Sequence, residues 1–486
     1  MSRADLACFL ALAGIYVASR EVLHRAGVQF DSFGIQEYWQ ILPVDLLQRE
    51  PWTSLWYLHA QPPLFNALLA LAFQLGDWPE DVLRAGFAVI GISTLMLFFL
   101  LLRIWRVPGT AALAATAIVG MNPSFIGYEH WAFYTALEPL LVVAGAVAVT
   151  LWDRASGRSA ASYASIFGLS VAALVLTRAL FHPLWAAVLA VGVLVMRAKS
   201  GRGVGRAQLA WALLPCVVGL ALMTKNAAVS GHFATSSWLG MNMSNMAFSA
   251  VPASEANALD EQGVITPLHR IGPFRAIARY RPLHLVVEPE LPRSMPTGIA
   301  ALDVERKASG VPNFNHLWYA AVSRVMLRDS LRVVRHSPAR AASVFWRALQ
   351  LFCRPTSDYG GIAANVAKIW PLEEWYRRTF FPGGSIGLVV ATLVFALGYS
   401  VRAAWTAAAG GSAHAFGAGP AVYVAVTVLW VTVVGNLAEF GENNRFRFAL
   451  DPLIAAVAIA AAANLTRRWR HAPTPTGLAK AARFAG

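Results

Sequence analysis

Charged residues are scarce in this chain of 486 residues. Asp, Glu, Lys and Arg together make up 14% of it, whereas hydrophobic residues make up 57%, and the mean hydropathy is +0.51. A soluble protein of this length carries roughly 25% charged residues, which it needs to cover its surface. The composition therefore excludes an ordinary soluble domain and indicates a protein that crosses a membrane several times.

Cysteine is also rare, and its three positions have no metal-ligand spacing. Cys8 and Cys216 fall inside apolar runs, and Cys353 stands alone in a long loop. Neither a disulfide framework nor a cysteine-based metal site is therefore expected.

Basic residues exceed acidic ones, and the formal net charge is +14. Most arginines, however, stand in short turns between apolar runs or in the long loop, without a basic stripe interleaved with aromatic residues. Lysine and arginine are enriched in the cytoplasmic loops of membrane proteins. We therefore expect no nucleic-acid partner, and we assign the charge to membrane topology.

Several apolar runs reach the roughly 20 residues that a bilayer-spanning helix needs. With the basic turns placed in the cytoplasm, the sequence predicts an all-α polytopic membrane protein of about ten spans, with both termini inside. The first run has no small-residue cleavage site, so it is interpreted as a retained helix. The predicted spans are 4–24, 83–103, 108–125, 134–152, 162–180, 183–198, 207–224, 384–402, 419–436 and 448–466.

This topology divides the chain into three parts. They are an N-terminal transmembrane module (1–224), a long outer loop (225–383), and C-terminal helices with a short cytoplasmic tail (384–486). The first loop (25–82), the turn around Glu129 and the turn 436–447 would also lie on the outer side of the membrane.

Two outer segments are predicted to be helices that lie on the membrane. The run 62–75 is too short to span, so we expect a surface-lying or re-entrant helix. The segment 317–352 has arginines on one face and apolar residues on the other, which is typical of a helix lying on lipid headgroups.

Carboxylates at the outer membrane boundary are the first candidates for chemistry. Asp31 stands in an aromatic loop, where partial desolvation would raise its basicity; the alternative is a helix N-cap. Glu129 and His130 form an ionisable pair at a membrane boundary. Such a pair is a candidate for function; the alternative is that both residues are solvated at the interface. Glu138 lies deeper, where it would pair with a buried arginine or stay protonated.

Basic residues at the outer helix ends are unexpected, because positive charge favours the inner side. Guanidinium groups bind phosphate through paired, charge-assisted hydrogen bonds, so a lipid-linked phosphate is a natural ligand. The alternatives are headgroup anchoring or an internal ion pair with Glu439 or Glu442. The residues concerned are Arg178, His182, Lys225, Arg445 and Arg447.

Tryptophan and asparagine recur in the long loop, at Trp238, Asn242 and Asn315 beside His316, while His59 precedes a double proline in the first loop. Aromatic rings stack on the apolar faces of sugars, and amides bond their hydroxyls. The same residues would also suit a loop folded against the membrane surface.

Together these features resemble the GT-C superfamily of integral-membrane glycosyltransferases, which includes protein O-mannosyltransferases and aminoarabinose transferases. The match is an ordered set of loose motifs across most of the chain. It comprises Asp31 in the first outer loop, His-x-x-Pro-Pro-Leu from His59, Asn-Pro at 122–123 before Glu129, and Glu-x-x-Arg-x-Arg from Glu442 to Arg447.

The resemblance implies a polyprenyl-phosphate sugar donor and an inverting transfer to a lipid, glycan or protein acceptor on the outer face, the periplasmic face if the membrane is a bacterial inner membrane. It assigns Asp31 as the general base and Arg445 with Arg447, aided by Lys225, Arg178 or His182, as donor-phosphate ligands. The long loop would close over the site.

The chain departs from this family in two ways. Ser32 follows Asp31 where the mannosyltransferases have a tandem Asp-Glu, and the Trp-Trp-Asp element of oligosaccharyltransferases is absent. No Asp-x-Asp pair is evident, so a divalent metal stays open, with Asp31 and Glu129 as ligands if one binds. A transporter or flippase of a lipid-linked glycan is the alternative function, and a non-catalytic scaffold is the third.

Overall fold

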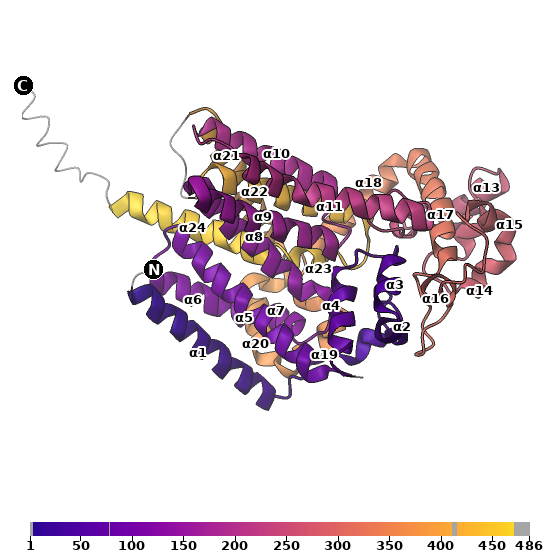
Figure 1. Ribbon diagram of the computed structural model, residues 1–486, viewed down its shortest axis with the longest axis horizontal. Coiled ribbons are helices and arrows are strands. Elements are labelled where there is room, and N and C mark those ends of the chain that lie inside the picture. Colours follow the sequence, from indigo (N-terminus) through magenta and orange to yellow (C-terminus); the bar gives the residue numbers. More distant parts are fainter. Residues whose placement is uncertain (1–2, 77, 411–415, 471–486) are drawn as a thin grey trace, which may run out of the picture.

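The computed structural model describes residues 3–76, 78–410 and 416–470 (Figure 1). The described part is helical, with short 3-10 turns and two isolated β-bridges. Seven of its helices are long and apolar enough to cross a membrane. They are α1 (Arg3–Arg25), α5 (Glu80–Ile104), α8 (Leu137–Arg154) with the preceding η2 turn (Tyr134–Ala136), α9 (Gly157–Thr177), α11 (Arg206–Ser230), α21 (Gly387–Ala408) and α22 (Ala418–Ala438).

An eighth crossing is present if a bent pair counts as one span. Helices α6 (Gly109–Gly120) and α7 (Pro123–Glu129) meet at an angle of 62°. The bend falls at Asn122-Pro123, because proline has no amide hydrogen to continue the ladder and Asn122 caps the new helix by accepting from the Ser124 amide.

The ten predicted spans all coincide with helical segments. Two of these helices, however, are not candidate membrane spans by length and composition. Helix α10 (Pro183–Lys199) has 17 residues, and α24 (Asp451–Arg470) has an aspartate in its first turn and arginines in its last. The structure therefore shows an all-α protein with seven or eight candidate spans. We call α1, α5–α11, α21, α22 and α24 the helical module.

Helix α8 lies at the centre of this module and packs against α5, α9 and α22. Small residues allow close packing between neighbouring helices. A Cβ on Gly168 of α9 would lie 2.1 Å from the Trp211 carbonyl oxygen of α11, so those two backbones touch. The centre of the bundle is thus buried on all sides, while α1 and α21 remain largely exposed, as expected for helices that face lipid.

Short helices cover one end of the helical module, and we call residues 26–79 and 231–386 the outer assembly. The predicted membrane-lying segment 62–75 contains α4 (Leu64–Phe73), ten residues long. The remaining helices are α2 (Val44–Arg49), α3 (Pro51–Trp56), α12 (Leu239–Phe248), α13 (Ala253–Glu261), α14 (Ile277–Tyr280), α15 (His284–Val287), α16 (Ala300–Asp303), α17 (Leu317–His336), α18 (Pro338–Phe352), α19 (Ala363–Lys368), α20 (Trp370–Phe380) and, joined to the module, α23 (Asn443–Phe448).

The predicted continuous helix 317–352 is wrong at one point. Pro338 cannot donate a backbone hydrogen bond, and the chain breaks at Ser337 into α17 and α18. Helix α18 packs against α22 and α23, across the outer end of the module. Helix α17 packs on α12 within the outer assembly, so its arginine-rich face lies over protein and solvent in that assembly.

The outer segments contact one another, as expected if they share one side of the membrane. The first loop pairs with the turn after α7, where the Asp31 amide donates to the His130 carbonyl at 2.8 Å. Asn315 accepts a bond from the His59 amide at 2.8 Å. Asn444 donates to the Pro355 carbonyl at 2.9 Å.

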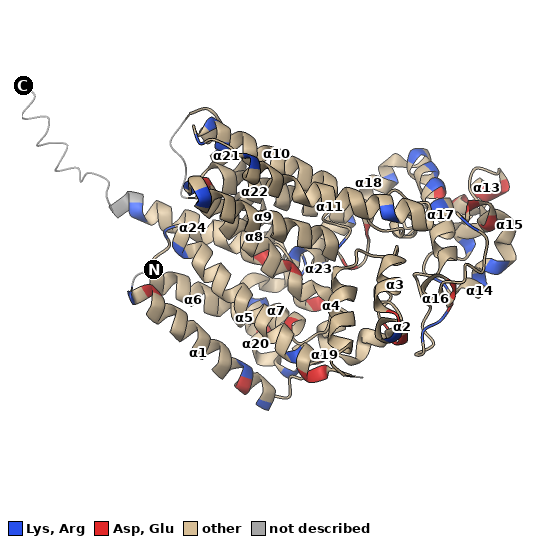
Figure 2. Cartoon of the chain, in the orientation of Figure 1, with Lys and Arg blue, Asp and Glu red and all other residues tan. Residues whose placement is uncertain are grey.

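The opposite end of the module carries the beginning of α1 and the end of α24 (Figure 1). Arginines there bind other helices: Arg103 of α5 pairs with Asp5 of α1 at 2.7 Å, and Arg154 donates to the Ile104 carbonyl at 3.0 Å. Lysines and arginines gather at this end in Figure 2, whereas the outer assembly carries both signs of charge. The tail beyond residue 470 lies outside the described residues.

Candidate functional site

A cavity of about 510 Å³ lies where the outer ends of the spans meet the outer assembly, and we call it the outer pocket. Its wall combines residues from the first loop, the start of α8, the junction of α9 and α10, α12, and the α22–α23 turn. The residues used below are Trp39, Gln61, Tyr134, Arg178, His182, Trp238, Asn242, Glu439, Glu442 and Arg445.

Arg178 follows the last residue of α9 and is 6% exposed. It pairs with Glu138 in the first turn of α8, with Nη1 to Oε1 at 3.0 Å, which confirms the expected partner of that glutamate. Its guanidinium carbon lies 4.1 Å from the Phe446 ring centroid. Because Glu138 is buried, the pair needs both members, and Arg178 is held rigidly at the pocket wall.

Arg445 on α23 is the second guanidinium of the pocket and is 3% exposed. It pairs with Glu442, Nη2 to Oε2 at 2.7 Å, and its carbon lies 5.2 Å from the Phe133 centroid and 5.0 Å from the Tyr359 centroid. The buried Nε atom has no hydrogen-bond partner among the described residues. Arg445 lines the outer pocket, so its guanidinium group is in place to pair with an anionic ligand bound there.

The two guanidinium groups approach the same aromatic ring from different helices. The carbon of Arg178 lies 5.4 Å from the Tyr134 centroid and that of Arg445 lies 5.8 Å from it. The pocket wall therefore carries two guanidinium groups, each paired with a carboxylate, with Tyr134 between them.

Two glutamates of the α22–α23 turn line the pocket in different environments. Glu442 is held by Arg445, and Tyr359 donates to it at 3.3 Å. Glu439 has no side-chain partner among the described residues, and burial together with the Glu442 charge raises its pKa to about 7. A carboxyl that titrates near neutrality is suited to accept and release a proton at that pH.

The remaining wall is uncharged. Burial lowers the pKa of His182, so its imidazole is neutral, and Nδ1 caps α10 through the Leu184 amide at 3.2 Å. Trp39 stacks on Phe274 and is 44% exposed. Gln61 and Asn242 make no side-chain hydrogen bond to another described residue, so their amides are free to bind a ligand.

The structure thus brings together six of the predicted site residues: Arg178, His182, Trp238, Asn242, Glu442 and Arg445. Glu439 was not predicted as a functional residue, only as an ion-pair partner. Its position three residues before Glu442, at the outer end of an apolar run, was the available signal.

Asp31 does not line the outer pocket. Its carboxylate accepts the Phe33 amide at 3.1 Å and so stabilises the turn that leads into the 3-10 helix η1 (Phe33–Gln36), whose N-cap position is occupied by Ser32.

Glu129 faces the interior of the helical module. It forms an ion pair with Arg20 of α1, Nη2 to Oε2 at 2.5 Å, and accepts from Tyr16 at 2.8 Å. His130 lies beside it, with Nδ1 2.9 Å from the Ile126 carbonyl oxygen. In the described part of the chain no three His, Cys, Asp or Glu residues are grouped to hold a metal ion.

Four further predicted residues form hydrogen bonds that hold the loops. Lys225 donates to the Leu58 carbonyl, and the fully buried His59 lies 2.8 Å from the Ser237 hydroxyl. Burial and Lys225 lower the pKa of His59 to about 3, so it is neutral. Asn315 binds the His59 amide, and His316 caps α17 through the Trp318 amide at 3.2 Å.

Arg447 is also absent from the outer pocket and lines a different cavity, so the structure does not bring Arg445 and Arg447 together as predicted. Residues two apart on a helix point about 200° from each other, which sends these side chains to opposite faces of α23. Arg447 instead binds Asp451, Nε to Oδ1 at 2.9 Å, and the Phe352 carbonyl at 2.8 Å.

No protein-family model, curated protein or solved structure matches this chain. The geometry of the pocket is therefore the basis for assigning a function.

Proposed function

We propose that the protein is a membrane glycosyltransferase of GT-C type, which transfers a sugar from a polyprenyl-phosphate donor to an acceptor hydroxyl at the outer, periplasmic face. The observation that carries the proposal is the outer pocket, where two buried guanidinium groups and the Glu439 carboxyl, which has no ion pair with another described residue, converge at the outer ends of apolar helices. A ligand that reaches this place from the bilayer and carries an anionic group fits that chemistry.

The donor phosphate is assigned to Arg445 and Arg178. Both line the pocket, and each already pairs with one carboxylate of its wall or of the adjoining helix. Guanidinium groups in a poorly hydrated site bind phosphate strongly and stabilise the charge that grows on it as the sugar leaves.

The sugar is assigned to the uncharged wall. The exposed ring of Trp39 offers an apolar face, and the free amides of Gln61 and Asn242 offer donors and acceptors for hydroxyls. A transporter would also need a polar site, but it would place that site near the bilayer midplane between broken helices, whereas this pocket lies at the outer helix ends.

Glu439 is assigned as the general base in place of Asp31. An inverting transfer needs one base that takes the proton of the acceptor hydroxyl as that oxygen attacks the anomeric carbon and the phosphate departs. Glu439 lines the pocket and has a pKa of about 7, which suits proton transfer at neutral pH.

A transfer assay in proteoliposomes tests the proposal, with a panel of radiolabelled polyprenyl-phosphate sugars and an extract of envelope lipids and glycans as acceptor. The wild type should transfer one of them, and Arg445→Ala should lower kcat/KM about 10²–10³-fold. Arg158→Ala, an exposed arginine at the inner end, is the control and should leave transfer unchanged.

Two results would reject the proposal. One is transfer by Arg445→Ala at the wild-type rate. The other is movement of a labelled lipid-linked sugar across the bilayer with no transfer from any donor of the panel, which would make the protein a flippase.

A further inference from the structure

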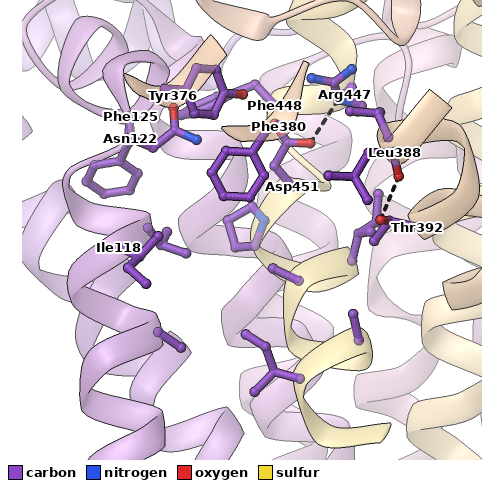
Figure 3. Close-up of a pocket in the computed structure, with 18 of the residues that line it drawn as sticks. Ile118, Asn122, Phe125, Tyr376, Phe380, Leu388, Thr392, Arg447, Phe448 and Asp451 are labelled. Carbon is purple, nitrogen blue, oxygen red and sulfur yellow. Dashed lines mark hydrogen bonds and ion pairs between the residues drawn. The ribbon is translucent and has the colours of Figure 1, made fainter. Parts of the chain in front are cut away.

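A second cavity, about 470 Å³ in volume, lies between α6, α20, α21 and α24, on the face of α23 that carries Arg447 (Figure 3). We call it the apolar groove. Most of its wall consists of side chains such as Ile118, Leu388 and Ala455. The wall also includes Thr392 of α21, whose hydroxyl already donates to the Leu388 carbonyl at 2.7 Å. That wall therefore offers a ligand only apolar contact.

The groove changes character along its length. Asn122, Tyr376, Arg447 and Asp451 gather at its outer end, while Figure 3 shows the opposite end lined by apolar side chains. A ligand that matches this gradient has a polar end and a hydrocarbon chain, with the chain pointing into the membrane.

The length of the groove corresponds to one leaflet. Its lining on α24 extends from Asp451 to Ile459, which at 1.5 Å per residue is about 12 Å. Half of the roughly 30 Å hydrocarbon core of a bilayer is about 15 Å. An acyl chain of an ordinary outer-leaflet phospholipid fits this depth, whereas a polyprenyl chain is several times longer.

A small polar cleft adjoins the outer end of the groove. It has a volume of about 340 Å³ and shares Phe381 with the groove. Two arginines line it: Arg377 is neutralised by Asp358 and Glu373, but Arg354 is exposed and has no ion pair with another described residue. The cleft thus contains one exposed guanidinium group that has no carboxylate partner among the described residues.

We propose that the apolar groove and this cleft together bind one anionic phospholipid of the outer leaflet. One acyl chain occupies the groove beside Ala455 and Thr392, and the phosphate lies against Arg354. Trp375 of α20, which lines the groove and is 47% exposed, then lies at the membrane interface, where tryptophan is favoured. The site is separate from the outer pocket and does not depend on the sugar chemistry proposed there.

Photo-crosslinking of the whole protein in nanodiscs tests this placement without any substitution. Phosphatidylglycerol with a photoreactive group at the end of one acyl chain should label the groove-lining peptides of α21 and α24, as mapped by mass spectrometry. Labelling confined to exposed positions such as Leu429 of α22, with none in the groove, would overturn the proposal.

Variants test the two halves of the site separately. Arg354→Ala should lower the retained phosphatidylglycerol, counted by native mass spectrometry, about fivefold relative to wild type. The control Arg158→Ala should not change it. Ala458→Phe fills the groove and should abolish the crosslinks while helical circular dichroism and the gel-filtration profile stay as in wild type.

Competition identifies the occupant. Excess phosphatidylglycerol should displace the label, and phosphatidylcholine should displace it less well, since its headgroup has no net charge. Displacement by polyprenyl phosphate alone would overturn the proposal and assign the groove to the sugar donor.

Discussion

The two ends of the helical module use buried arginine differently. At the inner end Arg197, 3% exposed, donates to the Trp152 and Ala155 carbonyls at the C-terminus of α8. At the outer end Arg178 and Arg445 are equally buried, yet they line a cavity and pair with carboxylates. Burial alone therefore does not separate a structural arginine from a binding one; the difference is whether its partners are backbone carbonyls or the wall of a pocket.

The inner arrangement has a simple physical cause. The last four carbonyls of a helix have no partner within it, and in a membrane protein they lie near lipid, where an unbonded polar group is costly. Arg197 donates to the Trp152 carbonyl in the last turn of α8 and to the carbonyl of the C-cap residue Ala155, and so links α10 to the end of α8. At the outer end the covering loops enclose a cavity, and Arg178 and Arg445 line it while paired with carboxylates.

The largest expected effect is on catalysis, from Glu439→Gln. Removal of the base should lower kcat about 10²–10⁴-fold. In wild type the rate should rise with pH through about 7, because the carboxylate form of Glu439 accepts the proton. In the variant that rise should disappear, as measured by the pH profile of kcat in proteoliposomes.

Thermal unfolding separates this role from a structural one. The raised pKa means that the folded protein holds the Glu439 proton more tightly than the unfolded chain does, so its stabilising contribution is present below pH 4 and is lost as the pH rises through about 7. Glu439→Gln should therefore be at least as stable as wild type above neutral pH. A variant that is both slow and less stable there would contradict the assignment.

The second effect is on stability, from Arg197→Ala at the inner end. Loss of charge-assisted hydrogen bonds to two carbonyls should lower the free energy of unfolding by about 2–3 kcal/mol. The measurement is the midpoint of thermal unfolding in detergent, with the exposed Arg158→Ala as control. The kcat of the folded variant should stay at the wild-type value; a fall comparable to that of Arg445→Ala would erase the distinction between the two ends.

Much of this architecture was predictable from the sequence because the membrane imposes simple rules. Apolar runs of helix length and basic turns predicted the helical segments and gathered the four outer segments at one end, although seven or eight of the ten predicted spans are candidate spans in the described part of the chain. The sequence predicted that Arg178 and Arg445 lie on the same side of the membrane, but it did not predict that they meet. Their common approach to Tyr134 depends on helix rotation, which a single sequence does not determine.

Two residues that do not line the outer pocket show that the direction of a side chain determines which partner it contacts. Glu129 was expected at the membrane boundary, but its carboxylate forms an ion pair with Arg20 of helix α1. Arg447 lies two residues from Arg445 and faces another cavity. Arg447 was placed by its proximity to Arg445 in the sequence and Glu129 by its position at the membrane boundary, and neither observation gives the direction of a side chain.

The smallest expected effect, from Asp31→Asn, decides between the two candidate bases. Asparagine accepts an amide hydrogen bond about as well as aspartate does, so the start of η1 should survive and the stability should change by less than about 0.5 kcal/mol. Because Asp31 does not line the outer pocket, kcat should stay within about twofold of wild type in the same proteoliposome assay. Asp31→Ala, which removes the acceptor, should cost about 1 kcal/mol of stability with the same kcat. If Asp31→Asn instead lowered kcat as far as Glu439→Gln does, the base would belong to the first loop, and that loop would have to move over the pocket during turnover.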